Sequence, residues 1–149
     1  MTPGPNLEQG GGAGYHAPCE AGRVPAVDVV DETFLAVPPA TAAAAFADPA
    51  AWQRYWPDLR LHAYADRGLE GVRWTVTGAL TGTMEVWLEP VLDGTLVHYF
   101  LRADPAEPLP AKAVEKLRRS RQLAAKALAL RLKAVLEDGR APGIPPTAE

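Results

Sequence analysis

The chain of 149 residues contains one cysteine, Cys19, so no disulfide can form within it. Its three histidines and this cysteine match no zinc-site spacing, and we expect neither a metal nor another cofactor. No apolar run is long enough to span a bilayer, and residues 1–24 lack the basic start and apolar core of a signal peptide. These absences predict a soluble, cytoplasmic protein without a membrane segment.

Sequence motifs of common catalytic sites are also missing. The chain has no Ser-His-Asp order, no glycine-rich phosphate loop and no HExxH motif. The catalytic residues are therefore unknown at this stage, and the pattern favours a protein that is not an enzyme.

Charge is divided unevenly along the chain, although the net charge is only −3. Residues 1–110 carry 6 basic and 14 acidic side chains, whereas residues 111–149 carry 9 basic and 4 acidic side chains. An acidic body that ends in a basic segment suggests contacts within the chain, or an acidic partner. An acidic protein of this kind is not expected to bind nucleic acid.

The ends of the chain differ in composition from its middle. Residues 1–24 are rich in glycine and proline, and with residues 140–149 we predict that they form a disordered leader and tail around one domain at residues 25–139. The apolar spacing inside that domain predicts a definite order of elements. These are a strand at 27–37, short helices at 40–47 and 48–56, strands at 59–66, 71–79, 83–89 and 95–102, and a helix at 110–138.

The last helix is long and amphipathic, at about 40 Å if it is regular. Proline is tolerated at its start, and Gly139 follows its end. Eight apolar residues fall on its core face: Val114, Leu117, Ala124, Ala125, Leu128, Leu132, Val135 and Leu136. The opposite face is expected to be solvated and carries Glu115, Arg119, Gln122, Lys126, Lys133 and Glu137. Segregated strands and helices predict an α+β domain whose antiparallel sheet packs on this helix.

Three segments resemble the START-like superfamily, also called SRPBCC or Bet v 1-like, in its bacterial polyketide cyclase/dehydrase-like branch. They are AVPPATAAAAF, ADPAAWQRYWPDL and GALTGTMEVWLEPVLDGTLVHYFLRADP. The resemblance covers about residues 26–138 and implies a helix-grip fold, in which a curved antiparallel sheet wraps around the long C-terminal helix. It also implies a cavity for a hydrophobic or amphipathic small molecule. With four strands after the helix pair, the chain is one hairpin shorter than larger members.

We expect the cavity to be lined from the short second helix, the inward strand faces and the long helix. The candidate ligand-binding residues are Trp52, Tyr55, Trp74, Val76, Met84, Val86, His98, Arg121 and Leu128. Packing alone would also explain the apolar ones, because each buried side chain contributes about 1.5 to 3 kcal/mol.

Two of these candidates have charged or titratable side chains. Arg121 interrupts the apolar face of the long helix, so it meets an anionic group of a ligand, extends out to water, or pairs with a sheet carboxylate such as Glu85 or Asp31. His98 could serve as a general acid or base, yet alternation places it on the opposite face of its strand from Tyr99.

Three functions are compatible with these features. The first is binding or transport of a lipid, polyketide or aromatic intermediate by a monomer or homodimer. The second is a polyketide cyclase or dehydratase, which requires a carboxylate, histidine or tyrosine inside the cavity. The third is an interaction module in which the basic face of the long helix docks an acidic partner and the core is filled.

Overall fold

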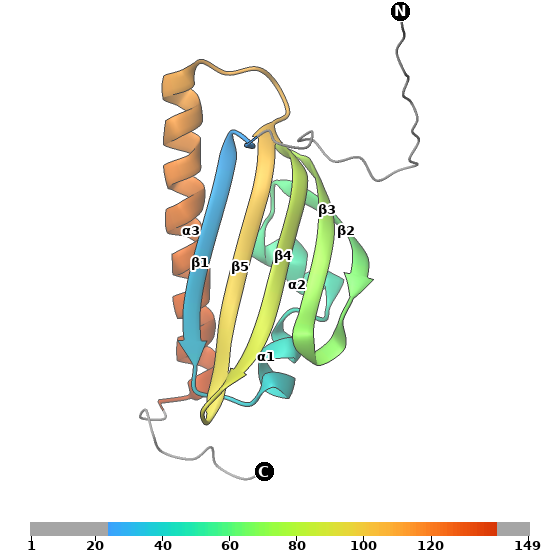
Figure 1. Ribbon diagram of the computed structural model, residues 1–149, viewed down its shortest axis with the longest axis vertical. Helices are drawn as coiled ribbons and strands as arrows, with labels where there is room; N and C mark the ends of the chain where they lie inside the picture. The colour runs from blue at the N-terminus through green and yellow to red at the C-terminus, as the bar shows by residue number, and fades with distance from the viewer. Residues whose placement is uncertain (1–23, 140–149) are drawn as a thin grey trace, which may run out of the picture.

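Five strands and three α-helices form the part of the chain that the computed structural model describes, residues 24–139 (Figure 1). The elements run in the order β1 (Val27–Leu35), α1 (Pro39–Ala45), α2 (Pro49–Tyr55), β2 (Leu59–Asp66), η1 (Gly68–Glu70), β3 (Gly71–Gly78), β4 (Leu80–Val91), β5 (Gly94–Pro105) and α3 (Ala111–Glu137). The predicted α+β helix-grip class is confirmed. The predicted leader and tail lie outside the described residues, apart from Val24 at the border.

All five strands belong to one antiparallel sheet of order β1-β5-β4-β3-β2. Residues paired across it share a face, so Asp31, Tyr99 and Val86 point inward, whereas Glu32, His98 and Trp87 point outward. The inner face carries most of the buried apolar side chains of the core. The residues of β3 and β4 that the alternation predicted to face the core are therefore the ones that point inward.

Helices lie on the inner side of the sheet. Figure 1 shows α3 alongside β1 at one edge, with α1 and α2 behind the remaining strands. The described residues 24–139 contain no helix that could span a membrane.

Prolines and one aspartate define the helix pair. Pro39 and Pro49 stand in the first turns of α1 and α2, and the Asp48 carboxylate accepts a hydrogen bond from Ala50 N. Side chains of α2 then bond to the carbonyls that end α1: Trp52 Nε1 donates to Phe46 O, and Tyr55 Oη donates to Ala45 O, each at 2.8 Å. The two aromatic residues thus fix the angle between the helices.

The polar face of α3 is solvated only in part: Glu115 and Arg119 are exposed, whereas the other four side chains bind the free edge of β1 or the residue that follows it. Gln122, Lys126 and Lys133 donate to the carbonyl oxygens of Val30, Glu32 and Phe34 at 2.8, 3.0 and 2.8 Å. The Glu137 carboxylate accepts from Ala36 N at 2.8 Å. An edge strand exposes unpaired backbone groups, and these side chains cover them.

The predicted core face of α3 is also wrong in part. Ala124 is exposed and Val135 is 72% exposed, while Ala125 and Leu128 are buried. Contact with the sheet occupies a narrower strip of the helix than its apolar pattern suggests.

Candidate functional site

A small cavity lies between the inner face of the sheet, the end of α1, Trp56 and α3. Its apolar lining includes Phe46, Trp56, Val86, Val97, Leu128 and Leu132. The volume of the cavity, measured as the space that the centre of a water molecule can occupy, is about 20 Å³. This is room for about one water molecule. The core is nearly filled, so any larger ligand must displace side chains or shift α3.

One corner of the cavity is polar. Asp31 and Thr33 line it, and the side chain of Asp31 is only 5% exposed. Thr33 Oγ1 donates to Asp31 Oδ2 at 3.0 Å, and Lys126 Nζ lies 3.0 Å from Asp31 Oδ1 and 2.8 Å from Thr33 Oγ1. A buried carboxylate needs such partners, and Lys126 supplies the charge from a half-exposed position.

Tyr99 closes the cavity on the sheet side. Its hydroxyl donates to Met84 Sδ at 3.1 Å, and its ring stacks on Trp56 with 6.1 Å between centroids. Burial raises the pKa of Tyr99 well above its ordinary value, although the nearby Arg121 guanidinium opposes the shift. The phenol is therefore neutral at physiological pH and acts as a hydrogen-bonding group.

The raised pKa of Tyr99 predicts instability at alkaline pH. A tyrosine in the unfolded chain ionises with a pKa near 10.0, whereas the raised pKa of folded Tyr99 keeps its phenol protonated there. The stability that the buried phenol contributes is therefore complete below pH 10 and falls as the pH rises above it. We expect a loss of about 1.4 kcal/mol per pH unit above that point. Urea unfolding at several alkaline pH values should show a flatter decline for Tyr99→Phe than for the wild type. Tyr64→Phe, at a half-exposed site, should keep the wild-type slope.

Several predicted ligand residues instead form an aromatic cluster in the solid core. Trp74 is fully buried and makes edge contacts with Trp52 and Trp56, at 5.3 and 5.5 Å between centroids. Val76 and Met84 are almost fully buried but do not line the cavity. Of the nine candidates, Val86 and Leu128 line it. Among the described residues, Trp74 Nε1 is a buried donor without a hydrogen-bond partner.

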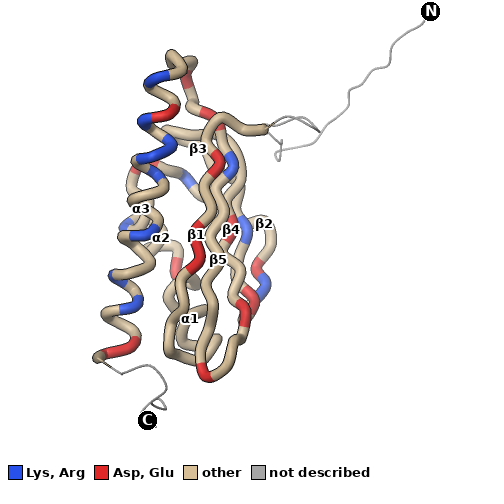
Figure 2. Tube along the Cα trace, turned by 60° about the vertical axis from the view of Figure 1, so that its left-hand side comes forward, with Lys and Arg blue, Asp and Glu red and all other residues tan. Residues whose placement is uncertain are grey.

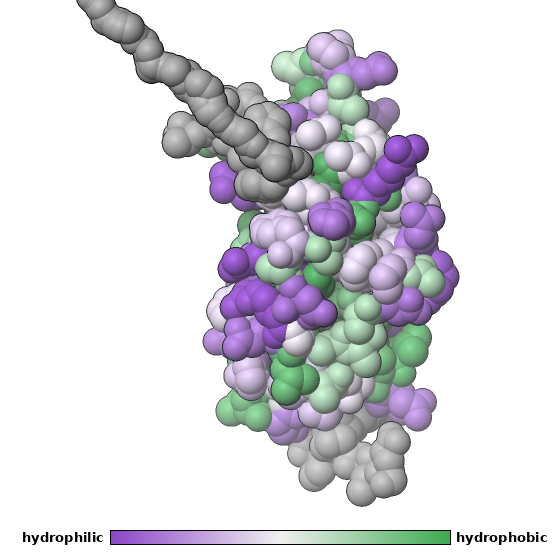
Figure 3. Space-filling model, turned by 90° about the vertical axis from the view of Figure 1, so that its right-hand side faces the viewer, coloured by the Kyte–Doolittle hydropathy of each residue, from purple (hydrophilic) through white to green (hydrophobic). Residues whose placement is uncertain are grey.

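Trp52 also lines a second, more open groove of about 530 Å³ between α1, α2 and the β2–β3 turn. Several alanines and Leu69 share its wall. Figure 3 views the molecule from the β2 side, where hydrophilic and hydrophobic side chains alternate over the surface. The groove is separate from the cavity between the sheet and α3, although Phe46 lines both.

Arg121 pairs inside the chain, with Asp58 in the loop between α2 and β2 at 2.5 Å. The two partners suggested by the sequence are wrong. Asp31 binds Lys126, and Glu85 lies on the outer face, where it binds Arg67 and Arg73. The side chain of Arg121 is 14% exposed and does not line the cavity.

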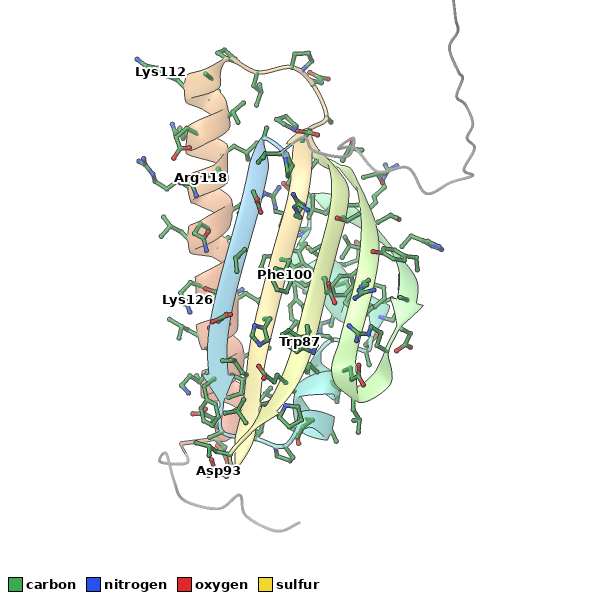
Figure 4. All side chains as sticks on the ribbon, viewed as in Figure 1. Trp87, Asp93, Phe100, Lys112, Arg118 and Lys126 are labelled. Carbon is green, nitrogen blue, oxygen red and sulfur yellow. The ribbon has the colours of Figure 1, made fainter. Side chains whose placement is uncertain are left out.

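His98 lies on the outer face of the sheet, so its predicted place in the cavity is wrong. Its ring stacks on Trp87 at 4.2 Å between centroids, and its Nδ1 and Nε2 lie 3.0 and 2.9 Å from carboxylate oxygens of Glu32 and Glu89. Figure 4 shows Trp87 and Phe100 over the outer face of β4 and β5. Among the described residues, no group of three or more acidic, histidine or cysteine side chains has the arrangement of a metal site.

The sequence interpretation missed Asp31, Thr33, Phe46 and Tyr99 as cavity residues. For the first two a signal was present: strict alternation from Val27 places residues 29, 31, 33 and 35 on the same face of β1. A carboxylate in that series indicates a polar group inside the core.

No model of a known protein family matches the chain, and no curated protein matches it in sequence. Solved structures resemble it in shape. A protein from Deinococcus radiodurans (DR_A0006) has a TM-score of 0.58 and 15% identity over 76% of this chain and 99% of that one. Aha1 from Colwellia psychrerythraea, solved as a dimer, has a TM-score of 0.56 and 16% identity over 77% and 99%. The protein TTHA0849 from Thermus thermophilus has a TM-score of 0.52 and 16% identity over 76% and 99%. These likenesses show a shared fold.

Proposed function

We propose that this helix-grip domain binds a small apolar or amphipathic molecule in the cavity between the sheet and α3. The observation that carries the proposal is a mostly apolar cavity with one buried polar corner, formed by Asp31 and Thr33. Binding sites for small molecules combine apolar walls with a few polar groups in this way. The START-like resemblance of the sequence supports the same function.

Binding of a larger molecule requires the cavity to widen. The way in which α3 is attached to the sheet allows the helix to move away from the cavity on one side. One side of the helix is held to β1 by hydrogen bonds from Gln122, Lys126 and Lys133. Across the cavity, Leu128 and Leu132 meet apolar side chains without such bonds. A ligand that separates these apolar surfaces replaces one apolar contact by another, while the hydrogen bonds to β1 stay intact.

The polar corner favours a ligand that donates a hydrogen bond, such as a hydroxyl or amine on an apolar body. Asp31 accepts hydrogen bonds, and Thr33 Oγ1 already donates to it. Lipids, polyketides and aromatic intermediates with a hydroxyl group fit this description.

A cyclase or dehydratase is the second candidate, because a carboxylate and a tyrosine share the cavity as that chemistry requires. Two features favour binding over catalysis. The pKa of Tyr99 is raised, so its proton is held tightly, and Asp31 is already paired with Lys126.

The experiment is native mass spectrometry of the purified protein, followed by denaturing extraction and identification of released compounds. A titration with 8-anilinonaphthalene-1-sulfonate, monitored by tryptophan fluorescence, provides an affinity. Release of a stoichiometric apolar compound would support binding. An apo mass together with no saturable binding of the dye would contradict it.

Filling the cavity with a larger side chain should weaken binding. Ala129 lines the cavity and Ala124 is exposed on the same helix, so Ala129→Phe and Ala124→Phe form a matched pair. We expect Ala129→Phe to weaken dye binding at least about tenfold, which corresponds to roughly 1.4 kcal/mol, and Ala124→Phe to leave it unchanged. Equal affinities for the two variants would place the dye outside the cavity.

A further inference from the structure

Arg121 stands next to the cavity, one turn before it on the face of α3 that forms its wall. Ala125 and Leu132 line the cavity, and Arg121 precedes Ala125 by four residues, so these side chains are neighbours on one face of the helix. The guanidinium also lies near the phenol of Tyr99, where it opposes the rise of that residue's pKa. A positive charge is therefore placed at one end of a mostly apolar space.

Asp58 meets Arg121 from the opposite wall of the cavity. It belongs to the loop between α2 and β2, which also carries the wall residue Trp56, so the ion pair joins α3 to this loop. The side chain of Asp58 is 53% exposed, whereas that of Arg121 is only 14% exposed. An ion pair with a half-exposed acidic member contributes little to stability, so another carboxylate could replace Asp58 at little cost.

We propose that Arg121 binds the carboxylate of an amphipathic ligand, which replaces Asp58 on the guanidinium while the apolar tail of the ligand occupies the cavity. This inference rests on the proposed function and adds an anionic head group to the class of ligand. Asp58 shows that a carboxylate fits at this place. Among residues 24–139, the side chain of Arg121 makes one hydrogen bond, from Nη2 to Asp58 Oδ2, so Nε and Nη1 have no partner there. A ligand carboxylate is free to turn and accept two parallel hydrogen bonds from a guanidinium.

The charge of the neighbouring helix surface also favours an anion. The first part of α3, residues 111–121, carries five basic side chains and one acidic side chain. Figure 2 shows these basic residues along the helix. A concentration of one charge raises the local concentration of the opposite ion, so an anionic ligand is attracted to the end of the cavity where Arg121 lies.

The polar corner lies toward the same end of the cavity as Arg121. Lys126, which pairs with Asp31, follows Arg121 by five residues, or about 7.5 Å along the helix. A hydroxyl that donates to Asp31 and a carboxylate that binds Arg121 then belong to the same end of one ligand. Its tail extends toward Leu132. The ligand class is accordingly a carboxylic acid with an apolar chain and a hydroxyl near the acid group.

Calorimetric titrations of the full chain with decanoate and with 1-decanol test the proposal, because these probes share a tail and differ in the head group. The quantity compared is the ratio of the two affinities, from which effects of cavity opening on the tail cancel. We expect wild type to prefer decanoate at least about tenfold. Arg121→Met should remove this preference. Asp58→Asn removes the competing carboxylate and should raise the ratio at least about threefold.

Arg119→Met is the matched control on the same helix. Arg119 is 70% exposed and lies near Glu115, so its removal should change the ratio less than about twofold. Circular dichroism checks each fold. Equal affinity of wild type for the two probes would overturn the inference and leave the proposed function intact, as would a ratio that Arg121→Met and Asp58→Asn leave unchanged. Failure of wild type to bind either probe would overturn both.

Discussion

Replacing Gly71 with alanine is expected to prevent folding or to lower the free energy of unfolding by more than about 4 kcal/mol. Gly71 begins β3 with a φ of 119°, a conformation that side chains disfavour. A Cβ at this position would overlap the carbonyl oxygen of Val86 in the neighbouring strand. Both faults involve backbone atoms where β3 pairs with β4, so no side-chain rotation can relieve them.

Gly68→Ala is the matched control in the same turn. Gly68 has a φ of 61°, but an added Cβ would meet no atom within 4 Å. Its cost is therefore limited to left-handed strain, about 1 to 2 kcal/mol. Urea unfolding monitored by circular dichroism compares the two variants. Equal midpoints for them would show that β3 and β4 are farther apart at Gly71 than the structure indicates.

Local patterns were sufficient to predict the element order. Alternation predicted β2 at residues 59–66 without error, and Asp48 with Pro49 marked the start of α2. β4 was predicted too short, at 83–89, because Gly82 interrupts its alternation. In the structure β4 begins at Leu80 and continues through Gly82. A Cβ on Gly82 would collide with Ala103 of β5, so only glycine fits at this position of the strand.

The candidate site was less predictable because it depends on how α3 is rotated against β1. A helical pattern separates apolar from polar residues, but it does not say which polar side chains meet another strand. Lys126 and Lys133 have the spacing of a solvated face, and only the position of the free β1 edge explains their contacts. Arg121 was correctly identified as unusual. Its partner Asp58 is 63 residues away in a loop, where no local pattern could identify it.

Lys126→Met is expected to lower the free energy of unfolding by about 3 kcal/mol, because it leaves the Asp31 carboxylate buried without its cation. The side chain of Asp31 is 5% exposed, so solvent cannot replace the lysine. Lys133→Met is the control. Lys133 also donates to a β1 carbonyl, but its carboxylate partner is Glu137 on the same helix, and we expect a loss of about 1 kcal/mol. Urea unfolding at neutral pH measures both.

The double variant Asp31→Leu/Lys126→Met separates charge pairing from packing. A buried ion pair replaced by apolar side chains often keeps its stability, so the double variant should recover most of the loss seen in Lys126→Met. If the proposed ligand donates a hydrogen bond to Asp31, the same variant should fold yet lose affinity for hydroxylated ligands relative to purely apolar ones. Equal losses of stability in Lys126→Met and Lys133→Met would show that Asp31 does not depend on Lys126. The polar corner of the cavity would then be accessible to water, and the selectivity for a hydrogen-bond donor would lose its physical basis.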